Sequence, residues 1–236
     1  KNIELNSKRA KGDEILKNGD NIKIYFSDET FLKMSAASSN LNTDIYLKAY
    51  NEIKNIEIIF EHEDFMIVNK PEGVLSQKDT PDSISVNEWC IGYLMSKNFI
   101  DRESLKQFKP SVLNRLDRNT KGLLIFGKTL NGSRRLSEMI QKRDIKKYYI
   151  AKTEGKCTLN GTYKAFLNKD AKSNKVTIYE KEDDIPDGVK TSPITTDIKV
   201  LKAENDSSLL EIDLITGTSH QIRAPLPKLG YPLIGH

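Results

Sequence analysis

Asp117 is the residue of this sequence whose setting most suggests chemistry. It lies in the stretch NRLDRNTKGLLIFGKT, with Arg115 and Arg118 on either side of it and the apolar run 123–126 shortly after. A positioned carboxylate can act as a nucleophile or as a general base. The alternative is a solvated turn, because Asp is common where the chain reverses before a strand.

Two other kinds of site are disfavoured. A phosphotransfer site of the DxDxT type needs a second carboxylate two residues after Asp117, and the chain has Asn119 there. A metal centre needs clustered ligands, whereas the three histidines are scattered and the two cysteines lack the CxxC spacing of a zinc site. We therefore expect no metal.

Charge indicates the class of partner. The formal net charge is only +4, but the basic residues are clustered. Such clusters favour a polyanion, and RNA is the natural candidate. The clusters comprise Lys8, Arg9, Lys11, Arg134, Arg135, Lys142, Arg143, Lys146 and Lys147.

The elements that must position Asp117 are mostly short strands. Residues 56–60 and 65–69 read as two strands joined by an acidic turn, and KKYYIAKTEG and SLLEIDLITG read as two more. Helices are expected at 45–53 and at 131–143. A third helix is expected to begin after Ser85, which with Glu88 forms a capping box. Strands arriving in pieces predict an α+β fold: a mixed, mainly antiparallel central sheet with flanking helices.

The chain begins with a smaller element. Residues 3–26 alternate apolar stretches with turn signals and predict a short strand pair with a basic tip. About thirty residues are too few for an independent core. Residues 28–55 are expected to form a linker, and the larger domain is expected over 56–236.

Four motifs, in order, resemble those of the RluA-type RNA pseudouridine synthases. NRLDRNTKGLLIFGKT resembles their HRLDxxTSGLLLxAK, and IIFEHEDFMIVNKPEGV resembles their strand-turn-strand opening with NKPxG. KKYYIAK resembles the KxYxA segment, and ITGTSHQIRAPLPKLGYPLIG resembles TGRTHQIRVHLxxLGHPLxGD. The resemblance implies the synthase catalytic fold and conversion of uridine to pseudouridine, without a cofactor, in structured RNA such as ribosomal RNA.

The resemblance also implies roles for particular residues. Asp117 becomes the essential acid, as nucleophile or as general base. Arg223 becomes its ion-pair partner, and Tyr149 the aromatic residue that stacks on a flipped-out base. Arg115 becomes the residue that enters the RNA where the uridine has left, and Lys147 a further RNA contact.

The first residues resemble part of a known RNA-binding module. LNSKRAKGDEILKNGDNIKI is similar to the C-terminal half of the alpha-L module, so residues 1–27 are assigned to it. Lys8, Arg9 and Lys11 would then contact phosphates, which supplies affinity but little sequence information. We expect a monomer. We also expect a cytoplasmic location, since no signal-peptide pattern and no stretch of about 18 apolar residues is present.

The sequence departs from the family at several positions. Asn114 replaces the usual His and Lys121 a small residue, while Pro225, Pro227 and His236 are atypical near the end. The two prolines argue against a helix after Arg223, and we expect the domain to be C-terminally incomplete. These departures keep an alternative open: a catalytically impaired RNA-binding or ribosome-assembly protein that retains the fold.

Overall fold

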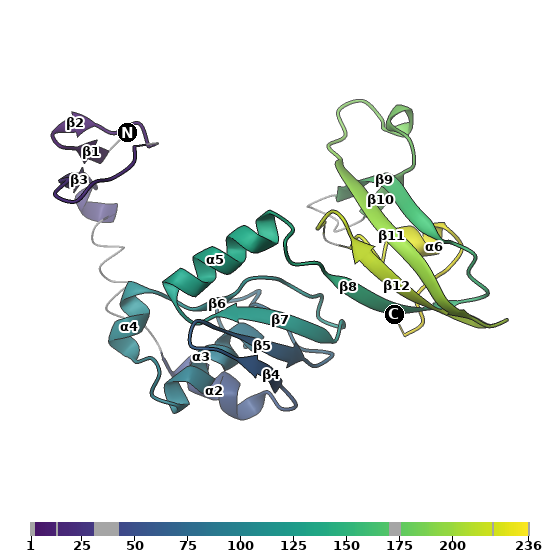
Figure 1. Cartoon of the computed structure of the whole chain (residues 1–236), viewed down its shortest axis with the longest axis horizontal. Helices are drawn as coiled ribbons and strands as arrows, with labels where there is room; N and C mark the ends of the chain where they lie inside the picture. The colour runs from purple at the N-terminus through teal and green to yellow at the C-terminus, as the bar shows by residue number, and fades with distance from the viewer. Residues whose placement is uncertain (1–2, 13, 31–42, 170–175, 219, 236) are drawn as a thin grey trace. The chain divides into compact units, whose positions relative to one another are not determined.

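The computed structural model of the 236-residue chain describes residues 3–12, 14–30, 43–169, 176–218 and 220–235. The chain divides into two compact units, Lys1–Arg135 and Leu136–His236. Three sheets are present in the described parts (Figure 1), and their strand orders are β2-β1-β3, β4-β5-β7-β6 and β10-β9-β11-β12-β8.

The N-terminal sheet is small and fully antiparallel. It consists of β1 (Ile3–Leu5), β2 (Lys8–Arg9) and β3 (Ile22–Ile24), and β1 pairs with both neighbours. The turn between β1 and β2 is tight, because Asn6 and Ser7 both adopt positive φ angles, of 50° and 64°. The predicted strand pair is thus extended by one strand, and its basic residues occupy β2 and the segment after it.

The sheet that carries Asp117 is built from β4 (Glu57–Glu61), β5 (Phe65–Lys70), β6 (Ser111–Val112) and β7 (Gly122–Gly127). The first two strands agree with the prediction to within one residue at each end. All its pairs are antiparallel, and β5 shows the period of two expected for a sheet with one covered face. Met66 and Val68 are fully buried in this face.

Helices α2 (Asp44–Glu52) and α3 (Val86–Ser96) share one hydrophobic core with this sheet, and the short α4 (Arg102–Gln107) adds Leu105. The predicted helix at 45–53 is confirmed as α2, which contributes Tyr46 and Ala49 to the core. A Cβ on Gly92 would lie 2.1 Å from the Tyr46 carbonyl oxygen. Only glycine therefore permits the close packing of α2 on α3.

The start of α3 differs in detail from a capping box. The Ser85 hydroxyl caps the helix by accepting from the Asn87 backbone N–H, as predicted. The Glu88 carboxylate accepts from the Ser85 hydroxyl, whereas in a capping box it would accept from the backbone N–H of the cap residue. Both side chains are buried, so the pair satisfies its polar atoms internally.

Helix α5 (Leu130–Gln141) follows β7 and confirms the helix predicted at 131–143. Its apolar residues Leu136, Met139 and Ile140 are half-buried, while Arg134 and Arg135 are exposed. The helix spans the boundary between the two units.

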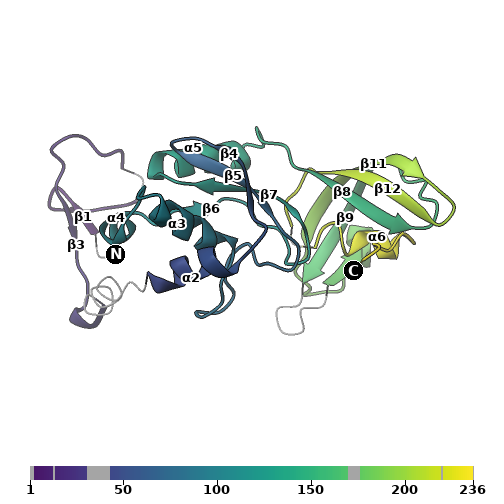
Figure 2. The same ribbon diagram turned by 90° about the horizontal axis from the view of Figure 1, so that it is seen from below.

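The second unit is a five-stranded antiparallel sheet (Figure 2). Its buried residues form two clusters. One includes Ile198, Leu210 and Ile212, and the other includes Ala165, Leu167 and Ile194. A single 3-10 turn, η1 (Glu182–Asp184), lies between β10 and β11. The strands are β8 (Tyr148–Glu154), β9 (Gly161–Lys169), β10 (Val176–Tyr179), β11 (Ser192–Ala203) and β12 (Ser207–Leu214).

The expectation that no helix follows Arg223 is wrong. A four-residue helix, α6 (Pro225–Lys228), begins directly after Ala224, with Pro225 in its first turn. The N–H groups of a first turn have no partner within a helix, so a proline there removes no helical hydrogen bond. Leu226 is buried and joins the core of the second unit.

The α+β prediction is confirmed, because mainly antiparallel sheets are accompanied by flanking helices. Every strand pair in the described residues is antiparallel, and the strands are divided among three sheets. No helix within the described part of the chain is long and apolar enough to cross a membrane.

Candidate active site

Asp117 lies in the first unit, on the segment that joins β6 to β7. Its side chain is half-buried, while Arg115 and Arg118 on either side are exposed. The Asp117 carbonyl accepts a 3.0 Å hydrogen bond from the Thr120 N–H, so the carboxylate is carried by a tight turn. The apolar run after Asp117 is a strand, since β7 begins at Gly122.

The N-terminal side of this segment is fixed on β7 by a side chain. Pairing of β6 with β7 covers only Ser111 and Val112, after which the Leu113 N–H still reaches the Ile125 carbonyl. The Asn114 amide then continues the pattern, because its oxygen accepts from the Ile125 N–H at 2.8 Å and its nitrogen donates to the Leu123 carbonyl at 3.1 Å. Asn114 thus uses both ends of its amide to extend the ladder toward Asp117.

The other side of the segment is tied to the turn after β5. Gly73 donates its N–H to the Arg118 carbonyl at 2.9 Å, and the Arg118 Nε donates back to the Gly73 carbonyl at 3.0 Å. The Arg118 guanidinium is exposed, but one of its nitrogens makes this backbone contact.

Lys70 organises the same region from inside. Its side chain is fully buried, and its Nζ donates to three backbone carbonyls, those of Pro71 at 2.9 Å, Val74 at 2.7 Å and Arg118 at 2.8 Å. Burial lowers the pKa of Lys70 to about 8, while the negative charges of Asp117 and Glu72 act in the opposite direction. A buried cation therefore lies within electrostatic range of the Asp117 carboxylate.

Tyr149 lies in the second unit, on β8. It pairs with Ile212 of β12, and its half-buried side chain packs against the core cluster that contains Leu210 and Leu226. Its neighbours Tyr148 and Ile150 point to the opposite, exposed face, as the period of two requires.

Arg223 lies two residues before α6 and is half-buried. The segment that leads to it is held by Gln221, which is almost fully buried. The Gln221 amide oxygen accepts from the Thr216 hydroxyl and the Thr218 N–H, and its nitrogen donates to the Thr195 carbonyl and the Thr196 hydroxyl. All four contacts measure 2.9–3.0 Å, so the amide has its full complement of partners.

The proposed RNA contacts are located on different elements. Lys8, Arg9 and Lys11 are exposed on the N-terminal sheet and just after it. Lys147 is half-buried next to β8, and its Nζ would lie 3.7 Å from a Cβ on Gly217, which places it beside the loop that leads to Gln221.

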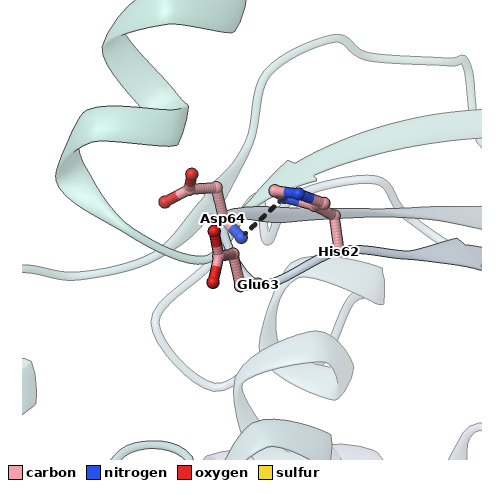
Figure 3. A group of neighbouring side chains, drawn as sticks. All are labelled: His62, Glu63 and Asp64. Carbon is pink, nitrogen blue, oxygen red and sulfur yellow. Dashed lines mark hydrogen bonds between the residues drawn. The ribbon is translucent and has the colours of Figure 1, made fainter.

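One group of side chains within the described residues has the spacing of metal ligands. Single donor atoms of His62, Glu63 and Asp64 lie within 4.8 Å of one another, in the turn between β4 and β5 (Figure 3). The Asp64 carboxylate accepts from the Thr129 hydroxyl, and the His62 Nδ1 accepts from the Asp64 N–H. The Asp64 carbonyl also accepts from the N–H groups of Lys128 and Thr129. These contacts explain the arrangement as a turn that fixes the start of α5.

The sequence analysis did not single out Lys70, Ser76 or Gln221 as site residues. Lys70 lies in the NKPEG match and Gln221 in the HQIR match, so the motifs contained both residues. The role of a buried lysine or glutamine is nevertheless recognised only through the carbonyls and hydroxyls that surround it. Ser76 had no signal in the neighbouring sequence, because Leu116, whose carbonyl accepts from the Ser76 hydroxyl, is 40 residues away in the chain.

Comparisons with known proteins show the family. Residues 64–227 match the family described as RNA pseudouridylate synthase. An uncharacterized RNA pseudouridine synthase of Mycoplasma pneumoniae is 32% identical over 238 aligned positions, which cover 99% of this chain and 68% of that protein. A ribosomal large subunit pseudouridine synthase C of Rickettsia felis is 28% identical, over 100% of this chain and 72% of the relative.

Solved structures support the fold. The human RNA pseudouridylate synthase domain containing 4 protein superposes with a TM-score of 0.58 at 19% identity, over 82% of this chain and 70% of its own. The corresponding domain containing 1 protein gives a TM-score of 0.56 at 20% identity, over 77% and 68%. With the family match covering Asp117, Tyr149 and Arg223, the chain belongs to the RluA-type RNA pseudouridine synthase family.

Proposed function

We propose that this enzyme isomerises uridine to pseudouridine in ribosomal RNA, and that Asp117 is its essential acid. One observation carries the proposal: Asp117 lies inside the family match, on a turn tied to β7 on one side and to the turn after β5 on the other. Relatives named as ribosomal large subunit synthases support ribosomal RNA as the substrate class.

The reaction explains which residue types are needed. The bond from the sugar C1′ to the base N1 breaks, a bond from C1′ to C5 forms, the proton on C5 is lost and N1 gains one. No redox change or hydrolysis occurs. Asp117 acts either as the nucleophile or as the general base.

Tyr149 and Arg223 complete the proposed chemistry. The nucleotide must leave its stack, which costs a few kcal/mol. Stacking of the base on Tyr149 would return about 1–3 kcal/mol, and the Tyr149 hydroxyl could relay a proton. Arg223 is proposed to pair with Asp117 and to keep its carboxylate ionised and oriented.

RNA contacts make up the rest of the proposal. Arg115 would enter the gap left by the uridine, and Lys147 would hold the RNA beside the base. Residues 1–27 would act as half of an alpha-L RNA-binding module, joined by the linker 28–55 to a catalytic domain over 56–236. Helix α2, within that linker, packs in the same core as α3. A monomeric state and a cytoplasmic location stay predictions.

Release of tritium from ribosomal RNA labelled at C5 of uridine tests the function. We expect release by the wild-type chain and essentially none by Asp117→Asn, because an amide can neither attack nor accept the proton. Asp187→Asn is a matched control, since Asp187 is exposed in the second unit. Thermal unfolding and RNA affinity of Asp117→Asn should stay at the wild-type values.

The second candidate, an RNA-binding or ribosome-assembly protein without catalysis, predicts a different pattern. RNA binding would be salt-sensitive and unchanged in Asp117→Asn, and no tritium would appear from any cellular RNA fraction. The atypical Pro225 and Pro227 motivated this candidate. Helix α6 accommodates both prolines, which weakens that motive.

A further inference from the structure

The segment 113–121 has a backbone that leaves the sheet before Asp117 and rejoins it at β7. A buried backbone group without a partner is costly, so the N–H and C=O groups of such a segment must be satisfied by other means. Here several of the partners are side chains. Asn114 serves the side toward β6, and Lys70 serves the Arg118 carbonyl on the far side.

Ser76 serves the residue immediately before Asp117. Its hydroxyl oxygen accepts from the Leu116 N–H at 3.0 Å and donates to the Leu116 carbonyl at 2.7 Å. One side-chain atom thus satisfies both backbone polar groups of Leu116. Ser76 is buried, with only 3% of its surface exposed, so water does not readily replace these contacts.

Ser76 is itself fixed by a rigid element. Its carbonyl accepts from the Asn87 N–H at 3.1 Å and from the Ser85 hydroxyl at 3.3 Å, both at the start of α3. Asn87 in turn accepts from the Val112 N–H of β6 through its side chain. These contacts therefore fix the position of Leu116 relative to the N-terminus of the buried helix α3.

We propose that Ser76 is a positioning residue for Asp117. The proposal rests on the proposed role of Asp117. Leu116 precedes the reactive residue directly, so its φ and ψ angles set the direction of the Asp117 side chain. Catalytic groups must be held to within a fraction of an ångström, and small displacements caused by distant substitutions can lower rates about 100-fold.

Ser76→Ala is the primary test. It removes the hydroxyl and leaves both polar groups of Leu116 without this partner. We expect kcat for tritium release to fall about 10–100-fold, with KM for RNA within about twofold, because the groups that bind RNA are untouched. Hydrogen exchange at the Leu116 amide should become faster in the same variant.

Ser208→Ala is a matched control. Ser208 is equally buried, and its hydroxyl makes the same pair of contacts in the second unit, accepting from the Cys157 N–H and donating to the Gly155 carbonyl, both at 2.8 Å. The two variants should lose similar thermal stability, but only Ser76→Ala should lose kcat. Equal kcat losses in the two variants, or an unchanged kcat in Ser76→Ala, would overturn the proposal.

Two further variants cover the case in which Ser76→Ala does not fold. Ser76→Thr keeps the hydroxyl and should retain turnover, whereas Ser76→Cys has nearly the same shape as serine but bonds weakly and should lose it. Equal turnover in the two contradicts the proposal. Failure of the underlying function is separate: it would appear as no tritium release by the wild-type chain, and failure of the proposed role of Asp117 as undiminished release by Asp117→Asn.

Discussion

At Asp117 the chain places a carboxylate on a turn whose backbone is held by other residues. Asn114, Arg118 and Lys70 all contribute side-chain contacts to it. A carboxylate on a freely moving loop would spend much of its time in unproductive orientations. The anchored turn instead holds the carboxylate in the fixed geometry that the role proposed for Asp117 requires.

Lys70 offers a test of this anchoring. Lys70→Met keeps an unbranched, buried side chain but leaves the carbonyls of Pro71, Val74 and Arg118 without their common donor. The Arg118 carbonyl keeps its hydrogen bond from the Gly73 N–H, so the carbonyls of Pro71 and Val74 are the two left unsatisfied. Buried groups left unsatisfied cost about 1–3 kcal/mol each, so we expect the free energy of unfolding to fall by about 2–6 kcal/mol. Urea denaturation of both proteins at pH 7 measures the difference.

Wild type and Lys70→Met should also differ in how the free energy of unfolding depends on pH. Burial lowers the pKa of Lys70 to about 8 in the folded state. Between pH 8 and the usual pKa of a lysine, the unfolded chain therefore binds more protons at this residue than the folded chain does. The cost of burying the charged lysine is fully present below about pH 8. The free energy of unfolding therefore rises as the pH increases above 8. The gap between wild type and Lys70→Met should therefore widen from about pH 8 to pH 10. A gap that narrows over this range would show that the charged lysine is the favoured folded form.

At the scale of elements, the predicted strands and helices were largely confirmed. Residues 65–69 form a short apolar run bounded by turn residues, and residues 131–143 have apolar residues at helical spacing, so the local sequence indicates each element. Helix α6 was missed because prolines were judged by their effect inside a helix, whereas Pro225 occupies the first turn. The division of strands among three sheets depends on long-range pairing, which no local pattern encodes.

The contact between α2 and α3 is the element-scale feature most sensitive to substitution. In Gly92→Ala the added methyl group would lie 2.1 Å from the Tyr46 carbonyl oxygen and 2.8 Å from the Tyr50 Cβ. Relief requires the helices to separate, so we expect a loss of about 1–3 kcal/mol in unfolding free energy. Thermal and urea unfolding measure it.

Gly217→Ala is the control for that substitution. At Gly217 an added Cβ would meet nothing closer than the Lys147 Nζ at 3.7 Å, which is an ordinary contact. Its stability should stay within about 0.5 kcal/mol of wild type. A similar loss in both variants would show that helix packing is not the cause.

For the molecule as a whole, the candidate site residues belong to two compact units: Asp117 to the first, and Tyr149 and Arg223 to the second. The N-terminal sheet adds exposed basic residues that we propose contact phosphates. Such contacts release counterions, so they influence affinity and its dependence on salt rather than the chemical step.

Lys8→Ala with Arg9→Ala tests this assignment. RNA affinity should fall to a similar extent for different RNA sequences, and the slope of log affinity against log salt should decrease by about one to two. The kcat for tritium release should not change. Lys202→Ala is the control, because Lys202 is an exposed cation of the second unit already paired with Glu204. An unaltered salt slope in the double variant would contradict the assignment.

The sequence by itself determined the family, the α+β class and most of the elements, because local periodicity and motifs are read along the chain. The same motifs singled out Asp117, Tyr149 and Arg223 as candidate site residues. The tertiary structure decided how these residues are held. Ser76 meets Leu116 across 40 residues, and Gln221 meets Thr195 across 26. Such partners satisfy buried backbone groups, and their identity depends on which distant segments the fold brings together.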